Sequence, residues 1–163
     1  MQENEYYSER RLVSPAGGRV FPLQELNGGE NSRRYSGEGF GVCAAGGIAG
    51  FLLGSLPAVE ICAPADGAVI SVLEDGSGFS LRTGDGLELA VELCGASEMM
   101  IRAGDLVAAG KCVCRMSQED FRGSPAAAVV TFPDCSLITE LHVHSGVRLA
   151  GKTAAEYRVH REI

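Results

Sequence analysis

Two glutamates on one predicted strand, Glu88 and Glu92, are candidates for acid–base chemistry in this 163-residue chain. Apolar side chains alternate with them through residues 87–94, which predicts a strand whose leucine and valine face lies in the core. Glu92 should then point away from the core, to solvent or to a shallow cleft. The two carboxylates would lie roughly 13 Å apart along the strand, beyond the roughly 5 to 10 Å of paired carboxylates in glycoside hydrolases. That reaction is not expected.

Two of the three histidines, His142 and His144, form a His-x-His motif near the C-terminus. Residues two apart on a strand point to the same side, and neutral imidazole binds zinc, copper and nickel. The motif is similar to the zinc-binding His-x-His of lysostaphin-type peptidases, which also need an earlier His and Asp. This chain has no histidine before His142. We interpret the pair as exposed polar residues, with a metal site as the alternative, and expect no cofactor.

The six cysteines raise the question of disulfides or zinc. They are Cys43, Cys62, Cys94, Cys112, Cys114 and Cys135. The N-terminal sequence is polar and acidic, unlike a signal peptide, which favours a reducing compartment and free, buried cysteines that act as small hydrophobic residues. The closest pair, Cys112-x-Cys114, has a shorter spacer than the usual two to four residues of zinc sites.

The net charge of −7 argues against a nucleic-acid partner, because the protein's field would repel phosphates. Residues 42–59 contain no charged side chain, but they include glycines and a proline. A membrane-spanning helix needs about 20 apolar residues, usually with flanking aromatic or basic residues. We therefore expect a buried strand followed by an apolar loop, and no membrane span.

The elements that must position these residues are expected to be short strands. The chain has 22 glycines, about twice the usual frequency of roughly 7%, scattered among short apolar runs. Two pairs of segments repeat, 14–20 with 63–69 and 103–111 with 145–152. These features predict an all-β fold, an antiparallel β-sandwich or barrel-like structure with internal pseudo-duplication and few short helical turns.

The sequence predicts one domain preceded by a short leader. Residues 1–11 are expected to be a flexible leader, and residues 12–163 a single domain. A brief helix is expected around 117–122, after a possible serine cap at Ser117.

The order and spacing of the motifs resemble the glucose-type enzyme IIA of the sugar phosphotransferase system, over about residues 12–160. The segments that carry the resemblance are 12–18, 37–42, 62–67, 79–81, 86–91, 104–110, 140–146 and 151–153. The resemblance implies a sandwich of the duplicated hybrid motif type with two neighbouring histidines on a shallow apolar surface. One histidine accepts a phosphoryl group from the phosphocarrier protein and passes it to the IIB domain of a membrane permease. Imidazole suits this chemistry because it is nucleophilic near pH 7.

The sequence departs from that family at the site itself. Glu92 stands where the resemblance places the phosphoacceptor histidine, and Ser77 stands in place of the supporting histidine. Cys94 replaces a glycine that usually follows the acceptor. Catalytic histidines are therefore absent from the expected positions, and Glu92 resembles a permanently anionic substitute for a phosphorylated histidine.

We expect a cytoplasmic, non-enzymatic relative of enzyme IIA that binds a partner protein. The phosphocarrier protein and a permease IIB domain are the partners that the resemblance implies. The expected binding surface consists of Phe40, Phe79, Ala90, Glu92 and Cys94. The alternative is a working phosphotransfer component with a non-standard acceptor, and a metal-binding relative of the lysostaphin-type peptidases is a further one.

Overall fold

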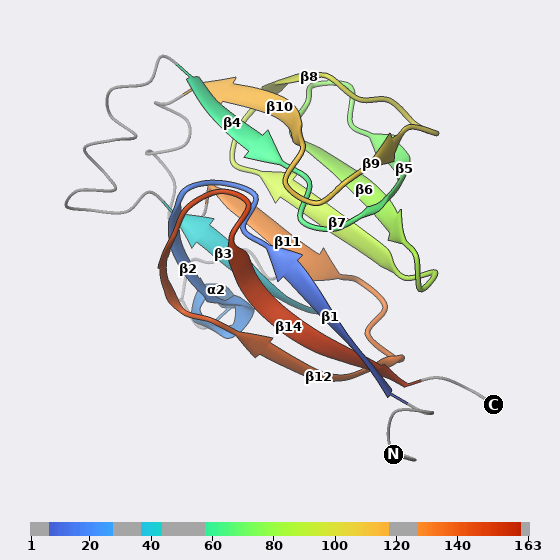
Figure 1. The fold of residues 1–163 in the computed structure, drawn as a ribbon. Coiled ribbons are helices and arrows are strands. Elements are labelled where there is room, and N and C mark those ends of the chain that lie inside the picture. Colours follow the sequence, from blue (N-terminus) through green and yellow to red (C-terminus); the bar gives the residue numbers. More distant parts are fainter. Residues whose placement is uncertain (1–6, 28–36, 44–57, 118–126, 161–163) are drawn as a thin grey trace.

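Short antiparallel strands joined by tight turns form almost the whole structure (Figure 1). The computed structural model describes residues 7–27, 37–43, 58–117 and 127–160. The elements are β1 (Tyr7–Val13), β2 (Gly18–Pro22), α2 (Leu23–Asn27), β3 (Glu38–Cys43), β4 (Ala58–Cys62), β5 (Gly67–Val72), β6 (Gly78–Thr83), β7 (Glu88–Leu93), β8 (Ser97–Met99), β9 (Leu106–Val107), β10 (Cys112–Ser117), β11 (Ala128–Phe132), β12 (Ile138–Val143), β13 (Gly146–Arg148) and β14 (Thr153–His160).

The described strands form three open sheets rather than a closed barrel. The large sheet has eight strands in the order β13-β2-β3-β11-β7-β6-β5-β9. Two three-stranded sheets, β1-β14-β12 and β4-β10-β8, complete the arrangement. The three sheets share one hydrophobic core. The predicted antiparallel β-sandwich is confirmed.

The internal duplication is visible in the hydrogen bonds between the two predicted repeats. The Val13 amide donates to the Pro64 carbonyl, and the Cys62 amide donates to the Pro15 carbonyl, each at 2.8 Å. Val13 and Pro15 occupy the places in the first repeat that Cys62 and Pro64 occupy in the second. The two turns therefore hold each other by an exchanged pair of bonds.

The second pair of repeats makes matching contacts with the first. The Ser14 amide donates to Lys152 and the Ala63 amide donates to Lys111, both at 2.8 Å. In return, the amides of Gly151 and Gly110 donate to Ser14 and Ala63, both at 2.9 Å. Both glycines have positive φ values, 85° and 88°, a conformation that other residues rarely adopt. The predicted pseudo-duplication is confirmed by this symmetry.

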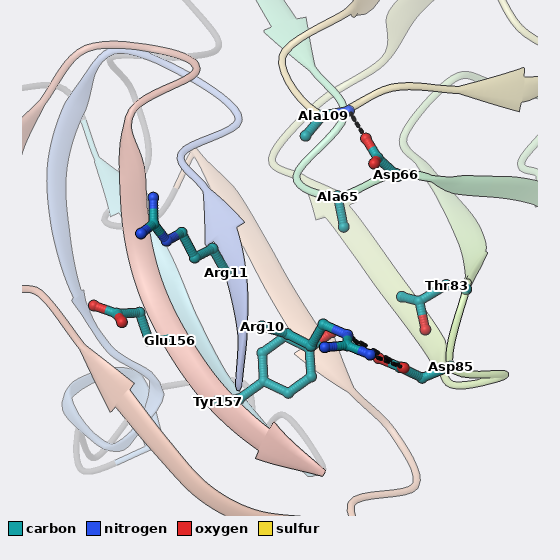
Figure 2. A pocket seen from close by; sticks show the side chains of 10 residues that line it. Arg10, Arg11, Ala65, Asp66, Thr83, Asp85, Ala109, Glu156 and Tyr157 are labelled. Carbon is teal, nitrogen blue, oxygen red and sulfur yellow. Dashed lines mark hydrogen bonds and ion pairs between the residues drawn. The ribbon is translucent and has the colours of Figure 1, made fainter. Parts of the chain in front are cut away.

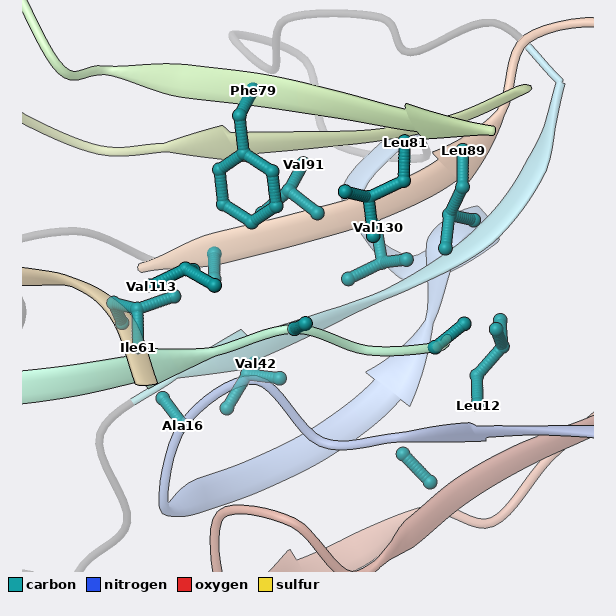
Figure 3. Packing of buried hydrophobic residues seen from close by; sticks show 14 of the residues in the cluster. Leu12, Ala16, Val42, Ile61, Phe79, Leu81, Leu89, Val91, Val113 and Val130 are labelled. Carbon is teal, nitrogen blue, oxygen red and sulfur yellow. The ribbon is translucent and has the colours of Figure 1, made fainter. Parts of the chain in front are cut away.

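The core lies between the large sheet and the two small ones (Figure 3). Leu89 and Val91 of β7 point into it, together with Leu81 of β6 and Val130 of β11. They meet apolar side chains of the small sheets, including Ile61 of β4. Burial of a Leu or Val side chain contributes about 1.5 to 3 kcal/mol, so this shared core is what stabilises the sandwich.

A second, smaller apolar cluster covers part of the other side of the large sheet, called here the outer face. Phe21 of β2 and Val129 of β11 pack there with Leu23 of α2, and all three are buried. The Phe21 ring lies over Gly41, where a Cβ atom would approach the ring to 2.7 Å. The short helix α2, which the sequence did not predict, therefore covers one end of this face.

The N-terminal segment is more ordered than the sequence predicts. The expectation of a flexible leader over residues 1–11 is wrong for residues 7–11, because β1 begins at Tyr7 and pairs along β14 to His160. The helix expected around 117–122 lies outside the described residues, except that Ser117 ends strand β10. Most of the apolar segment 42–59 also lies outside the described residues. No described helix is long and apolar enough to cross a membrane.

We predict that Gly39→Ala destabilises the protein, because a Cβ atom at this position would overlap the carbonyl oxygen of Val130 in the neighbouring strand β11. The expected loss in the free energy of unfolding is about 1 to 3 kcal/mol, measured by urea denaturation. Gly84→Ala is the matched control, since no atom lies within 4 Å of a Cβ there. Equal stabilities of the two variants would contradict the close packing of β3 against β11.

Candidate functional site

Ser77 and Glu92 lie side by side where strands β6 and β7 pair. Glu92 of β7 is opposite Gly78 of β6, and the Leu93 amide donates to the Ser77 carbonyl at 2.8 Å. On its other side Glu92 is opposite Val129 of β11. The two sequence-predicted positions, 15 residues apart in the chain, are therefore brought together at the centre of the large sheet.

The Glu92 side chain is half-buried on the outer face, with its Oε2 atom enclosed. The strand alternation expected for residues 87–94 is confirmed, since Leu89, Val91 and Leu93 are buried while Glu88 is exposed. Apart from the buried Val129, the neighbouring positions on the outer face are polar or small. Ala90 lies between Ser80 of β6 and Thr131 of β11, and both hydroxyl-bearing residues are only 8% exposed. A ligand is thus expected to reach only the exposed part of the Glu92 side chain and not its Oε2 atom.

Ser77 is held by a neighbouring carboxylate. Its backbone amide donates to Asp75 Oδ1 at 2.9 Å. The Ser77 hydroxyl and this amide together lower the pKa of Asp75, which stabilises the charged carboxylate. The residue in place of the supporting histidine therefore binds a carboxylate, whereas phosphoryl transfer would require stabilising positive charge.

The predicted binding surface needs a correction. Phe40 and Phe79 are 0% and 4% exposed and belong to the main core, so they do not contribute to an outer surface. Phe79 pairs with Val91, and this register turns both side chains inward. Ala90 and Glu92 do lie on the outer face, and Cys94 is exposed just beyond the end of β7.

The histidine pair lies in a different sheet from Glu92. His142 belongs to β12 and His144 follows it, and their rings meet edge to face with centroids 4.8 Å apart. The Nε2 atom of His144 is 2.7 Å from Oε1 of Glu156 in β14. Among the described residues, no three His, Cys, Asp or Glu side chains are arranged to hold a metal ion. His142 and His144 therefore form a polar cluster with Glu156 on the β1-β14-β12 sheet.

A cleft of about 700 Å³ lies between the β1–β14 pair and the β6–β7 turn (Figure 2). Arg10 of β1 forms a two-pronged ion pair with Asp85 in that turn, with Nε 3.0 Å from Oδ2 and Nη2 2.9 Å from Oδ1. The Tyr157 ring lies beside this pair. Opposite, Asp66 accepts a hydrogen bond from the Ala109 amide at 2.8 Å. The cleft is polar, and two of its charged side chains, Arg10 and Asp85, are paired with each other.

Some of these neighbours were missed at the sequence level. Val129 and Thr131 could have been assigned to the outer face from the alternation with Ala128 and Val130 in β11, but nothing marked them as neighbours of Glu92. The Arg10–Asp85 pair joins residues 75 apart in the chain and has no local signal. Both facts depend on which strands become neighbours.

A comparison with solved structures shows the fold. Glucose permease IIA from Mycoplasma capricolum superposes with a TM-score of 0.69 and 16% sequence identity, covering 91% of this chain and 96% of that one. No protein-family model matches the chain. No curated protein matches its sequence either. The similarity confirms the expected enzyme IIA-like fold and leaves the activity to be argued from the site.

We predict a pH-dependent loss of stability that is traceable to Tyr157. Burial raises the pKa of Tyr157 to about 12, with Asp85 adding to the rise and Arg10 opposing it. An unfolded tyrosine ionises near pH 10, so the folded protein keeps a proton that the unfolded chain loses, and stability falls as the pH rises from about 10 to about 12.

Chemical denaturation of wild type and Tyr157→Phe across this range measures the effect. The wild type should lose more of its free energy of unfolding than the variant, which has no group to ionise and retains the ring that packs on Phe132. Parallel decline of the two proteins would show that Tyr157 ionises normally.

Proposed function

We propose that this chain is a homologue of the glucose-type enzyme IIA of the sugar phosphotransferase system that carries no phosphate on histidine. It acts as a protein-binding, regulatory module in the cytoplasm. The observation that supports this proposal is the placement of Ser77 beside Glu92 on an enzyme IIA-like fold. These are the positions at which the family resemblance expects the two histidines.

The chemistry of the side chains supports the loss of phosphotransfer. A neutral imidazole nitrogen attacks a phosphoryl group without charge repulsion, whereas a carboxylate at Glu92 adds negative charge against it. Asp75, which accepts a hydrogen bond from the Ser77 amide, is a further carboxylate and supplies no positive charge to relieve this repulsion. His142 and His144 cannot replace the missing rings, because they lie on the β12 side of another sheet and His144 is bound to Glu156.

The surface we propose for binding is the outer face around Glu92, with the half-buried Ala90 and the exposed Cys94. A fixed carboxylate there gives the site a negative charge of the same sign as a phosphorylated histidine, so a partner that binds the phosphorylated form is favoured. By this reasoning the partner is a permease IIB domain or the phosphocarrier protein. Complementary charge across such a contact contributes chiefly to specificity and association rate.

We predict that the protein gains no stable label when it is incubated with labelled phosphoenolpyruvate, enzyme I and the phosphocarrier protein. The reason is that an acyl phosphate on Glu92 would hydrolyse readily and has no cationic support from Ser77. Stable label on the wild type, lost in Glu92→Gln, would overturn the proposal and favour a phosphotransfer component with a non-standard acceptor.

The double variant Ser77→His with Glu92→His provides the positive control for this assay. It places imidazoles at the two positions where the resemblance expects them, so it should accept label if the phosphocarrier protein still docks. An unlabelled, folded double variant would show that the docking surface has been lost as well.

We predict that Glu92→Lys weakens binding to the IIB domain or the phosphocarrier protein by roughly tenfold or more, measured by isothermal titration calorimetry. Glu88→Lys is the matched control, because Glu88 lies on the same strand and the same face but is exposed beside Arg82. It should change the affinity by no more than about twofold. If the two charge reversals changed the affinity equally, the effect would come from the net charge of the protein and not from a contact at Glu92.

A further inference from the structure

Two cysteines face each other across the β4–β10 pair. In the register of these antiparallel strands, Cys62 at the end of β4 is directly opposite Cys112 at the start of β10. Because 49 residues lie between them in the chain, the sequence does not reveal this relation. Both thiols are free in the structure.

The hydrogen bonds around the pair identify its geometry. The Ala63 amide donates to the Lys111 carbonyl at 2.8 Å, one residue beyond the pair on each strand. The Cys62 amide donates to Pro15 rather than to Cys112. This is the pattern of a non-hydrogen-bonded antiparallel pair, in which opposed Cα atoms are about 4.5 Å apart and the side chains are closest. A disulfide accepts Cα separations of about 4.4 to 6.8 Å.

The internal duplication allows this cysteine pair to be compared with the corresponding pair in the other half of the chain. Cys62 and Cys112 occupy the places that Val13 and Thr153 occupy in the other half, where β1 and β14 pair with the same one-residue shift in register. The fold therefore accepts an aliphatic residue and a threonine at this pair. The cysteines in the second half are not required for packing.

The surroundings of the pair give an order of reactivity. Cys112 is half-buried and Cys62 is only 5% exposed, so a reagent in solution reaches Cys112 first. Cys112 is close enough to Cys62 to disfavour the charged form of the Cys62 thiol. A third thiol, Cys114, is fully buried, and these described cysteines do not form a metal-binding group.

We propose that Cys62 and Cys112 form a redox modification site, at which a small disulfide such as oxidised glutathione converts the two thiols into a cross-strand disulfide. The Cys112 thiolate attacks one sulfur of the small disulfide and releases one small thiol. The Cys62 thiolate then attacks the Cys112 sulfur and releases the second. The two protein thiols lose two electrons and two protons, and the small disulfide gains them as two thiols.

The reaction should be slow at neutral pH and faster in alkali. Burial raises the pKa of Cys62 to about 11, and burial together with Glu60 raises that of Cys112. Because the thiolate is the attacking species, the initial rate should increase roughly tenfold per pH unit from about pH 7 to about pH 9.

Peptide mapping of the full chain tests the proposal. The reduced protein is incubated with oxidised glutathione at about pH 8.5, free thiols are alkylated, and the chain is cut by trypsin and glutamyl endopeptidase. Residues 61–74 contain Cys62 alone, and residues 112–115 contain Cys112 and Cys114. The expected product joins these two peptides, with the alkyl group on Cys114.

A link that closes a loop of about 50 residues should also raise the Tm by roughly 10 °C, reversibly with dithiothreitol.

Matched variants complete the test. Cys112→Ser should abolish both the linked peptide and the rise in Tm, whereas Cys94→Ser, which removes the exposed cysteine, should leave both unchanged. Alkylation of Cys62 and Cys112 after the incubation, or a link from Cys62 to any other cysteine, would overturn the proposal. The wild-type map decides this even if a variant is unstable, and neither result depends on phosphotransfer or partner binding.

Discussion

The exchanged hydrogen bonds between the two proline-containing turns are the constraint on which the rest of the fold depends. Proline has no amide hydrogen, but the carbonyls of Pro15 and Pro64 each accept a bond from the strand that leads into the opposite turn. Each half of the chain therefore completes the backbone pairing of the other half. This contact fixes how the two small sheets meet over the core, and the large sheet has the same symmetry, with β7 and β11 adjacent at its centre.

The candidate site lies at that centre. Glu92 has a strand on each side, so its backbone position is fixed by Gly78 and Val129 rather than by a flexible loop. A side chain on a rigid strand suits recognition, since little conformational entropy is lost when a partner binds. No nearby histidine among the described residues can take the place of Glu92 by a local movement. His142 of β12 and His144 in the turn after it lie with a different sheet from β7. The protein thus keeps the strand positions of the site while its side chains differ from the histidines that the resemblance implies.

Much of the fold could be predicted from local patterns, and the site only in part. Alternation assigned Glu92 to the outer face, and repeated turns revealed the duplication. Phe40 and Phe79 were placed on the wrong face because the direction of a side chain depends on strand register, which glycine-rich segments leave undefined. Strand β1 was missed because its partner β14 lies at the far end of the chain. The opposition of Cys62 and Cys112, like the Arg10–Asp85 pair, follows from tertiary pairing that no sequence spacing contains.

The symmetry of the large sheet also bears on self-association. Open sheets are liable to extend by pairing with another chain along an exposed edge. Here the two edge strands are the repeat-related β9 and β13, only two and three residues long. Leu106 and Val147 on them are exposed, but the backbone available for pairing is short at both ends. Duplication has therefore given both sides of the sheet the same protection against edge-to-edge aggregation.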